Sequence, residues 1–325
     1  MSDELTRRQF LIRSAKAGAS VVAACAIGYW FYDSNAPESS PDQKSSILLP
    51  DFSIPELGKK MSIVRGQNRS ETLRAALKAL GGIEIFIKNG DRVLLKVNAA
   101  FASPPMLSAT THPHVVSELT DLCYKIGAAS VWVTDNPIND PVSCFGLSGI
   151  AEAADSAGAR VILPNDNLFK PATLPDANLI KNWPVLYEPF KDINKVIGIA
   201  QIKDHHRSGA SMVMKNWYGL LGGRRNIFHQ DIHNIIKELA MMVKPTLVVL
   251  DGTTSMMTNG PTGGSLSDLK QTNTMIVGTD QVATDAFGAG LLGKNISDLP
   301  YIAKVEAKGI GTADYQSLNP IELSI

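Results

Sequence analysis

The chain has 325 residues, of which 31 are basic and 31 acidic, so its formal net charge is zero at neutral pH. A balanced charge and an aromatic content of 6% argue against a nucleic-acid-binding surface, and a hydrophobic content of 44% is ordinary for a globular protein with a buried core. The three cysteines form no CxxC pair and are too few for the roughly four thiolates of an iron–sulfur cluster, so the chain cannot hold such a cluster alone.

The first 36 residues have the pattern of an export signal. Residues 6–11 (TRRQFL) resemble the twin-arginine motif, and a mildly apolar run follows from Ala17 to Tyr32. We therefore expect residues 1–36 to engage the twin-arginine export machinery and to direct the protein to the periplasm or to the outer face of the cytoplasmic membrane. Three fates of this segment stay open: cleavage, lipidation at Cys25, or retention as a membrane anchor.

A linker and one large domain are expected to follow the signal. Residues 37–58 are polar and rich in proline and serine, which predicts a linker. We expect residues 59–325 to form one α/β domain. The segment near 164–194 is rich in proline, asparagine and aspartate and has weak periodicity, so it predicts an irregular excursion from that domain.

Within the domain, short β-branched runs alternate with stretches of helical periodicity. In residues 71–80, for example, apolar residues recur at spacings of three and four, as in an amphipathic helix. Continuous apolar strands separated by such helices indicate a three-layer α/β fold, in which helices cover both faces of a mainly parallel, Rossmann-like sheet. The predicted strands are 92–97, 130–134, 160–163, 196–202, 246–250 and 274–277, and the predicted helices are 71–80, 113–126, 232–243 and 282–287.

Polar residues recur where the predicted strands end. Lys96, Asp135, Lys203, Asp251 and Asp280 each end or directly follow a strand. Ligands of open α/β sheets bind outside the carboxyl ends of the strands, so these side chains converge on one edge if the sheet is parallel. Turn formation explains any single aspartate, but it does not explain a lysine at the end of an apolar strand. The set predicts a polar cleft.

Six sequence blocks between about residues 90 and 315 occur in the order typical of a known family. Together they resemble the DUF362 proteins, a prokaryotic group of poorly defined function. Many members of that group carry ferredoxin-like cysteine motifs, which this chain lacks, so the resemblance does not imply an iron–sulfur protein here. The blocks are LLKVN (94–98), TTHPHVV (110–116), VWVTDNP (131–137), KNWYGLLGG (215–223) after Lys203, LDGTTSMMTNGPTGG (250–264) and VGTDQVATDA (277–286).

Four of the six histidines lie in residues 203–233. His229 and His233 are four residues apart, a spacing that places two imidazoles on one helix face and suits a transition metal. The pair lacks the glutamate of the HExxH pattern, so the alternative is that His229 caps the helix and His233 faces solvent. His205 and His206 are the predicted proton-transfer residues, because imidazole titrates near pH ~6.5.

Asp135 and Asp251 are the predicted partners of these histidines, either to orient an imidazole or to bind a metal. The loop of residues 259–264 is rich in glycine and is expected to hold an anion after a strand, although neither a Walker A loop nor a GxGxxG fingerprint occurs. His112 opens a predicted helix, whose N-terminus attracts anions. The predicted ligand-binding residues are Lys96, Asn98, His112, Lys203, Lys215, Asn216, Gly260, Thr262 and Asp280.

These features predict an exported enzyme that acts on a small anionic substrate at the carboxyl edge of a parallel sheet. The lysines would bind the anion as charge-assisted donors. Metal-dependent or redox chemistry is one subclass of this prediction, and the sequence does not name the cofactor. The alternative is a non-catalytic ligand- or metal-binding protein of the cell envelope, which would use the same cleft without turnover.

Overall fold

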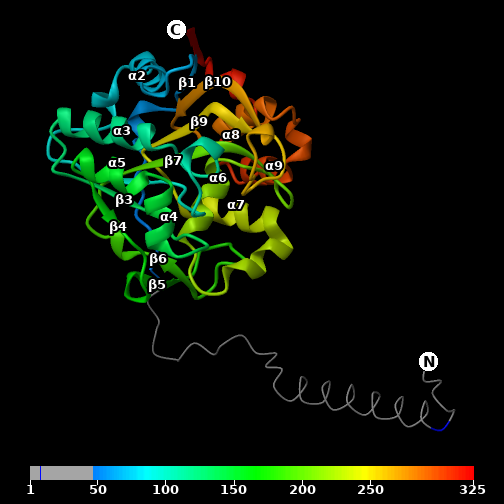
Figure 1. Cartoon of the computed structure of the whole chain (residues 1–325). Coiled ribbons are helices and arrows are strands. Elements are labelled where there is room, and N and C mark those ends of the chain that lie inside the picture. Colours follow the sequence, from blue (N-terminus) through cyan, green and yellow to red (C-terminus); the bar gives the residue numbers. More distant parts are fainter. Residues whose placement is uncertain (1–7, 9–46) are drawn as a thin grey trace, which may run out of the picture. The chain divides into compact units, whose positions relative to one another are not determined.

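Figure 1 shows the computed structural model of the chain, which describes Arg8 and residues 47–325. The rest of the expected export signal and the first part of the expected linker lie outside the described residues. The compact unit starts earlier than expected, since it spans residues 46–325. Phe52 is buried, and its backbone N–H donates to the Lys244 carbonyl oxygen at 3.0 Å. Among the described residues, we find no helix with the length and apolar character needed to cross a membrane.

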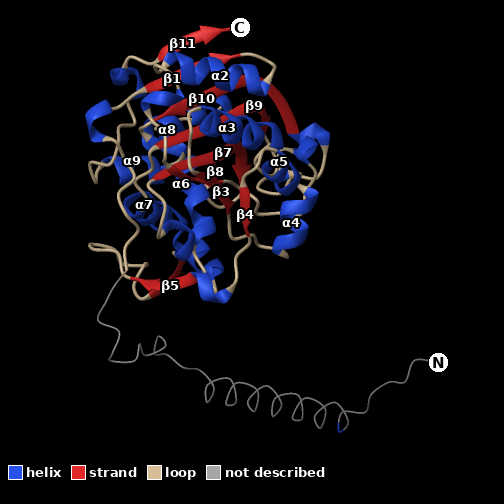
Figure 2. Ribbon diagram, turned by 90° about the vertical axis from the view of Figure 1, so that its left-hand side faces the viewer, coloured by secondary structure: helices blue, strands red, loops and turns tan. Residues whose placement is uncertain are grey.

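A mixed sheet of nine strands forms the centre of this unit (Figure 2). Five neighbouring strands, from β9 through β7, β2 and β3 to β4, run parallel, which confirms the mainly parallel sheet. At the other side β10 runs antiparallel to both β9 and β1. The order is β11 (Ile321–Ser324), β1 (Met61–Arg65), β10 (Leu269–Gly278), β9 (Leu247–Met256), β7 (Lys195–His205), β2 (Arg92–Lys96), β3 (Ser130–Thr134) and β4 (Arg160–Ile162), while β8 (Gly209–Ser211) pairs with β7.

Helices cover both faces of the sheet and make the three predicted layers (Figures 1 and 2). Successive strand residues point to opposite faces, so Leu94 and Leu95 of β2 belong to two different hydrophobic cores. One core includes residues of α2 (Arg69–Ala79), α3 (Pro113–Lys125), α4 (Pro141–Leu147) and α5 (Ile150–Ser156); the other includes residues of α6 (Val213–Asn216), α7 (Ile232–Met242), α8 (Gln281–Leu291) and α9 (Pro300–Glu306).

The segment 164–194 contains a hairpin of β5 (Phe169–Ala172) and β6 (Trp183–Leu186), with 3-10 turns and loops around it. The hairpin is attached to the segment that follows α6. Gly222 N–H donates to the Pro184 carbonyl oxygen at 2.8 Å, and Val185 forms an isolated antiparallel bridge with Leu221. These backbone bonds explain why a segment without a sequence period is ordered.

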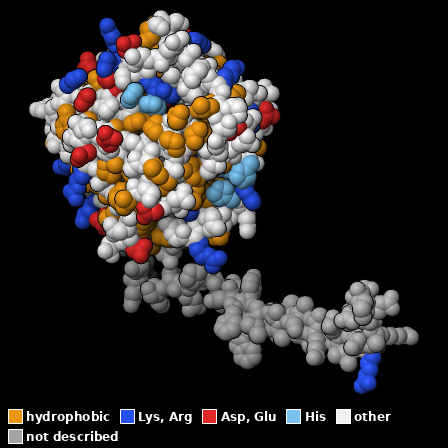
Figure 3. Space-filling view, viewed as in Figure 1, with side chains coloured by type: hydrophobic (Ala, Val, Ile, Leu, Met, Phe, Trp, Pro, Cys, Tyr) orange, Lys and Arg blue, Asp and Glu red, His pale blue; other side chains and the backbone are white. Residues whose placement is uncertain are grey.

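The charged surface agrees with the balanced composition. On the face drawn in Figure 3, basic and acidic side chains are interspersed around an area of hydrophobic side chains. A single-sign field of the kind that attracts nucleic acid does not develop on such a face.

Candidate functional site

The strand order of the sheet reverses between β2 and β7. From β2 the chain continues to β3 and β4 on one side, whereas β7, β9 and β10 follow on the other. The crevice outside the carboxyl ends of strands at such a switch point is the usual ligand site of open α/β sheets. A cavity of about 700 Å³ lies there, and we call it the switch-point cavity. Its lining includes the predicted residues Asn98, Asp135, Lys203, His205, His206, Lys215, Asn216, His229, Gly260 and Thr262.

A buried ion pair forms one wall of this cavity. Lys96 Nζ lies 2.8 Å from Asp135 Oδ1 and also donates to the Val97 carbonyl oxygen (2.7 Å) and to the Asn216 carbonyl oxygen (2.7 Å). Burial lowers the pKa of Lys96, and the Asp135 carboxylate opposes that effect. All three ammonium protons have acceptors, so Lys96 orders the strand ends and has no proton left for a ligand. Its contact with a ligand stays a prediction.

Gly219 lies against the same ion pair, so closely that no side chain fits at this position. A Cβ atom at this position would lie 1.9 Å from Asp135 Oδ1 and 2.9 Å from Lys96 Nζ. The glycine lets the backbone after α6 approach the ion pair directly, and its carbonyl oxygen accepts the Asn136 N–H at 3.0 Å.

Two other lysines reach the cavity with fewer partners. Lys203 Nζ donates to the Ala109 carbonyl oxygen at 2.6 Å. Lys215 Nζ lies 5.1 Å from the ring centroid of Tyr218 and has no hydrogen bond or ion pair to any described residue. Burial, together with the charge of Lys215, lowers the pKa of Lys203 to about 7, and burial together with the charge of Arg225 lowers the pKa of Lys215 to about 7. An anion between the two lysines would restore their charge.

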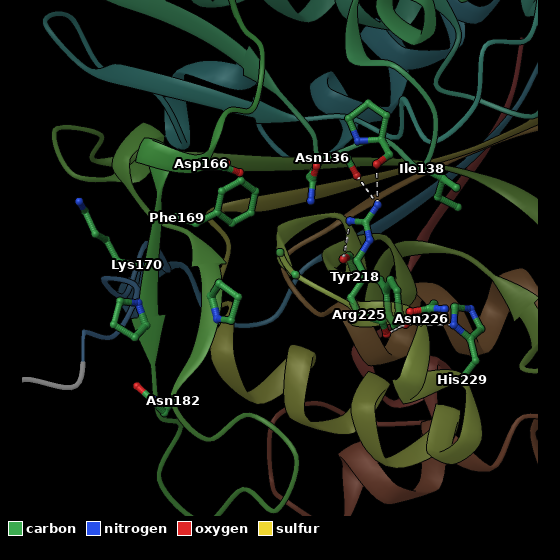
Figure 4. Close-up of a pocket in the computed structure, with 15 residues that line it drawn as sticks. Asn136, Ile138, Asp166, Phe169, Lys170, Asn182, Tyr218, Arg225, Asn226 and His229 are labelled. Atoms are coloured by element: carbon green, nitrogen blue, oxygen red, sulfur yellow. Dashed lines mark hydrogen bonds between the residues drawn. The ribbon is translucent and has the colours of Figure 1, made fainter. Parts of the chain in front are cut away.

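The Arg225 side chain links two loops through hydrogen bonds (Figure 4). Its guanidinium donates to the carbonyl oxygens of Asn136 (2.8 Å) and Pro137 (2.7 Å) after β3, and to those of Tyr218 (3.3 Å) and Leu221 (3.2 Å). With four of its five N–H groups committed, it fixes the shape of the cavity wall.

His205 is a neutral hydrogen-bond donor. Its Nδ1 accepts the backbone N–H groups of Arg207 (3.1 Å) and Ser208 (3.3 Å), so the ring proton sits on Nε2. Burial, followed by the nearby Lys215, lowers the pKa of His205 to about 2. His205 therefore presents Nε2–H as a donor, and its role in proton transfer stays a prediction.

His206 and His229 flank His205 in a stack of imidazoles, with ring centroids 5.0 Å and 5.9 Å from that of His205. His206 is exposed, and its Nδ1 lies 3.4 Å from the Gly260 carbonyl oxygen, which can only accept, so Nδ1 is the donor of this contact. His229 Nδ1 lies 3.0 Å from the Tyr218 hydroxyl group, which itself donates to the Arg225 carbonyl oxygen. Burial lowers the pKa of His229 to about 4.

The expected metal pair is not assembled on one helix. His229 lies in a 3-10 segment, Arg225–Asp231, whereas His233 lies in α7 and its ring stacks on Tyr301 at 6.2 Å. In the described part of the chain, no group of three or more His, Cys, Asp or Glu side chains is arranged to hold a metal ion.

His112 and Asp251 form a separate cluster outside the lining of the switch-point cavity. His112 caps α3, because its Nδ1 accepts the His114 N–H at 3.2 Å. Asp251 pairs with Arg69 of α2 at 2.9 Å. Burial, and then the Arg69 charge, lowers the pKa of His112 to about 4. Neither side chain lines the switch-point cavity, and their roles at a ligand site stay predictions.

Asp280 is at the opposite end of the sheet. Because β10 runs antiparallel to β9, the residue that follows β10 lies away from the carboxyl ends of the parallel strands. Its Oδ1 accepts the N–H groups of Val282 and Ala283, which caps α8, and Lys59 lies 3.1 Å from its Oδ2. Asp280 therefore caps a helix, and its role in ligand binding stays a prediction.

Sequence reasoning passed over Tyr218, which lies against Lys215 and His229. Its spacing of three from Lys215 was a usable signal, because residues three apart share one helix face. The sequence also gives no sign of Ala109, whose carbonyl oxygen accepts a hydrogen bond from Lys203, because no residue pattern identifies a backbone acceptor.

Three comparisons place the chain among known proteins. The model of the domain of unknown function DUF362 matches residues 93–290. A thylakoid-associated protein of Synechocystis sp. is 25% identical over 280 residues, covering 78% of this chain and 80% of that protein.

The similar solved structures are distant. The lactate racemase apoprotein from Thermoanaerobacterium thermosaccharolyticum aligns with a TM-score of 0.37 and 10% identity, over 71% of this chain and 58% of that one. A protein from Thermotoga maritima aligns with a TM-score of 0.34 and 14% identity, over 57% of this chain and 51% of that one. The chain thus corresponds to between half and two thirds of each solved protein.

Proposed function

This chain belongs to the DUF362 family, and we propose that it is an enzyme that acts on a small anionic substrate in the switch-point cavity. The observation that supports this proposal is the pair of buried lysines, Lys203 and Lys215, neither of which has an ion-pair partner among the described residues. A buried ammonium group without a counter-charge is costly, and structural lysines are normally paired. A bound anion would supply the missing charge.

The proposed roles follow from the hydrogen-bond patterns. Lys203 and Lys215 hold the acidic group of the substrate as charge-assisted donors. His205 donates from Nε2 to an oxygen of the substrate, as a neutral electrophile whose proton is fixed in place. His206 is exposed, so it exchanges protons with the substrate and solvent. A non-catalytic envelope protein would use the same cavity, and it would bind without turnover.

Calorimetric titration with inorganic phosphate and with succinate tests the proposal. We expect Lys203→Met and Lys215→Met each to weaken binding about tenfold or more, because each removes a charged donor. The exposed Lys78→Met is the matched control and should bind as the unaltered protein does.

Anion binding should also take up protons near pH 7, because it raises the lysine pKa values. The heat of binding should then depend on the ionisation enthalpy of the buffer. Absence of binding by the unaltered protein, or equal affinities in all variants, would overturn the proposal.

We also propose that residues 1–36 export the protein by the twin-arginine route, to the periplasm or to the outer face of the cytoplasmic membrane. The support is the TRRQFL pattern before an apolar run. The thylakoid association of the Synechocystis relative belongs to that protein, and membrane anchoring of this chain is part of the proposal. Fractionation of cells that express the unaltered chain or the Arg7→Lys, Arg8→Lys double variant is the test. Retention of only the double variant in the cytoplasm is expected, and identical distributions would contradict it.

A further inference from the structure

A second cavity, of about 800 Å³, adjoins the switch-point cavity. Figure 4 shows it between Phe169 of the β5–β6 hairpin on one side and Arg225, Tyr218 and His229 on the other. We call it the hairpin cavity. The residues that line both cavities are Asn136, Ile138, Tyr218, Arg225, Asn226 and His229.

The hairpin cavity differs from its neighbour in chemistry. Phe169, Pro171 and Pro184 give it an apolar wall opposite Tyr218. Its two basic lining residues are already engaged, since Lys170 pairs with Glu188 at 3.3 Å and Arg225 holds backbone carbonyl oxygens. Both basic side chains among the described lining residues thus have partners of their own.

The apolar wall is fixed by contacts of its own. Trp183 of β6 donates from Nε1 to the Gly222 carbonyl oxygen at 3.2 Å and packs against Phe228 with the two rings tilted by 56° and their centroids 4.4 Å apart. The ring of Phe169 lies against Gly222 so closely that a Cβ atom on Gly222 would approach it to 2.6 Å. The wall is therefore preorganised, which reduces the entropy lost when a ligand binds.

The switch-point cavity is larger than a small anion requires. One water takes up ~30 Å³ and a phosphate or carboxylate group only a few times more, whereas sites for whole small molecules measure roughly 300–1,000 Å³. Tyr218 lines both cavities, and Lys215 of the switch-point cavity lies over the Tyr218 ring.

We propose that the hairpin cavity holds a flat apolar group of the substrate, attached to the acidic group that lies between Lys203 and Lys215. This inference rests on the proposed function and narrows the substrate class to aryl phosphates, aryl carboxylates and similar anions. The Phe169 ring and the prolines face the flat group, and Arg225 sets the distance between it and the acidic end.

The test compares inorganic phosphate with 1-naphthyl phosphate by calorimetry, on the full chain and on variants of it. The unaltered protein should bind 1-naphthyl phosphate roughly tenfold more tightly than phosphate, from burial of apolar ring surface. Phe169→Ala should remove that advantage and Phe169→Leu should reduce it, while both keep the affinity for inorganic phosphate. Leu147→Ala, which truncates an exposed apolar side chain outside both cavities, should change neither affinity.

Phosphate affinity reports whether each variant is folded at the site. Phosphate binding that depends on Lys215, without any advantage of the naphthyl compound or with an advantage unchanged in Phe169→Ala, overturns this inference and leaves the proposed function standing. Loss of all phosphate binding in the unaltered protein overturns both.

Discussion

Replacement of Lys215 by methionine should make the ligand-free protein more stable. Lys215 is buried, and its pKa is lowered from 10.5 to about 7, first by burial and then by the charge of Arg225. At ~1.36 kcal/mol per pKa unit, the charged form in the fold is disfavoured by on the order of 5 kcal/mol. Methionine has a similar length and removes that cost. The charged side chain can relax toward the cavity, which reduces this cost in the unaltered protein. We therefore expect the substitution to raise the free energy of unfolding by about 1–3 kcal/mol at pH 7.

The pH dependence of stability gives the sharper form of this prediction. The folded pKa lies below the unfolded one, so between about pH 7 and 10 the unfolded chain binds more protons than the native protein. Stability of the unaltered protein therefore rises with pH across that window, and the Lys215→Met variant should rise less. Urea denaturation at several pH values measures the difference between the two, with Lys78→Met as control. A variant less stable than the unaltered protein at pH 7, or one with the same pH slope, would refute the reasoning.

Two further predictions concern the buried ion pair. Lys96→Met should lower the free energy of unfolding by about 3–5 kcal/mol, because it removes the ion-pair partner of the buried Asp135 and leaves the carboxylate only the Ala99 N–H as a donor; a loss below about 1 kcal/mol in urea denaturation would contradict this. Gly219→Ala should cost about 1–3 kcal/mol, because the new Cβ atom falls 1.9 Å from Asp135 Oδ1. The control is Gly146→Ala in α4, where a Cβ atom meets nothing within 4 Å and the change should be neutral or stabilising by up to about 1 kcal/mol. Equal thermal melting shifts in the two glycine variants would be the contrary result.

Local patterns sufficed for the parallel half of the sheet and failed for its antiparallel edge. The run 130–134 was predicted with the observed bounds of β3, because apolar β-branched residues mark a strand buried on both faces. The direction of β10 depends on its connection to β9. That connection, residues 257–268, is twelve residues long, so its length does not distinguish a hairpin from a crossover. Its residues Gly260 and Thr262 line the switch-point cavity, whereas Asp280 follows the antiparallel β10 and lies at the opposite end of the sheet.

The histidines show a second limit of sequence reasoning. The doublet His205-His206 suggested two equivalent proton carriers, yet the structure makes them different. Nδ1 of His205 accepts two backbone N–H groups from the turn that follows it, whereas Nδ1 of His206 faces a carbonyl oxygen across the cavity. The first pattern is local, but it depends on a turn geometry that residue types do not specify. The second depends on where a loop from β9 lies, which only the folded chain determines.

The three lysines of the site are alike in sequence and are distinguished by their acceptors. Among the described residues, Lys96 has a carboxylate and several carbonyl oxygens as acceptors, Lys203 has one carbonyl oxygen, and Lys215 has neither kind. A fully satisfied cation stabilises the fold, and an unsatisfied one destabilises it until a ligand arrives. The number of acceptors therefore ranks the lysines by the ligand contact expected of each, with Lys215 first. An anion that binds only the native state raises the free energy of unfolding. This gain should be largest at a pH where both lysines are charged in the complex, and it should fall as the pH rises above 7.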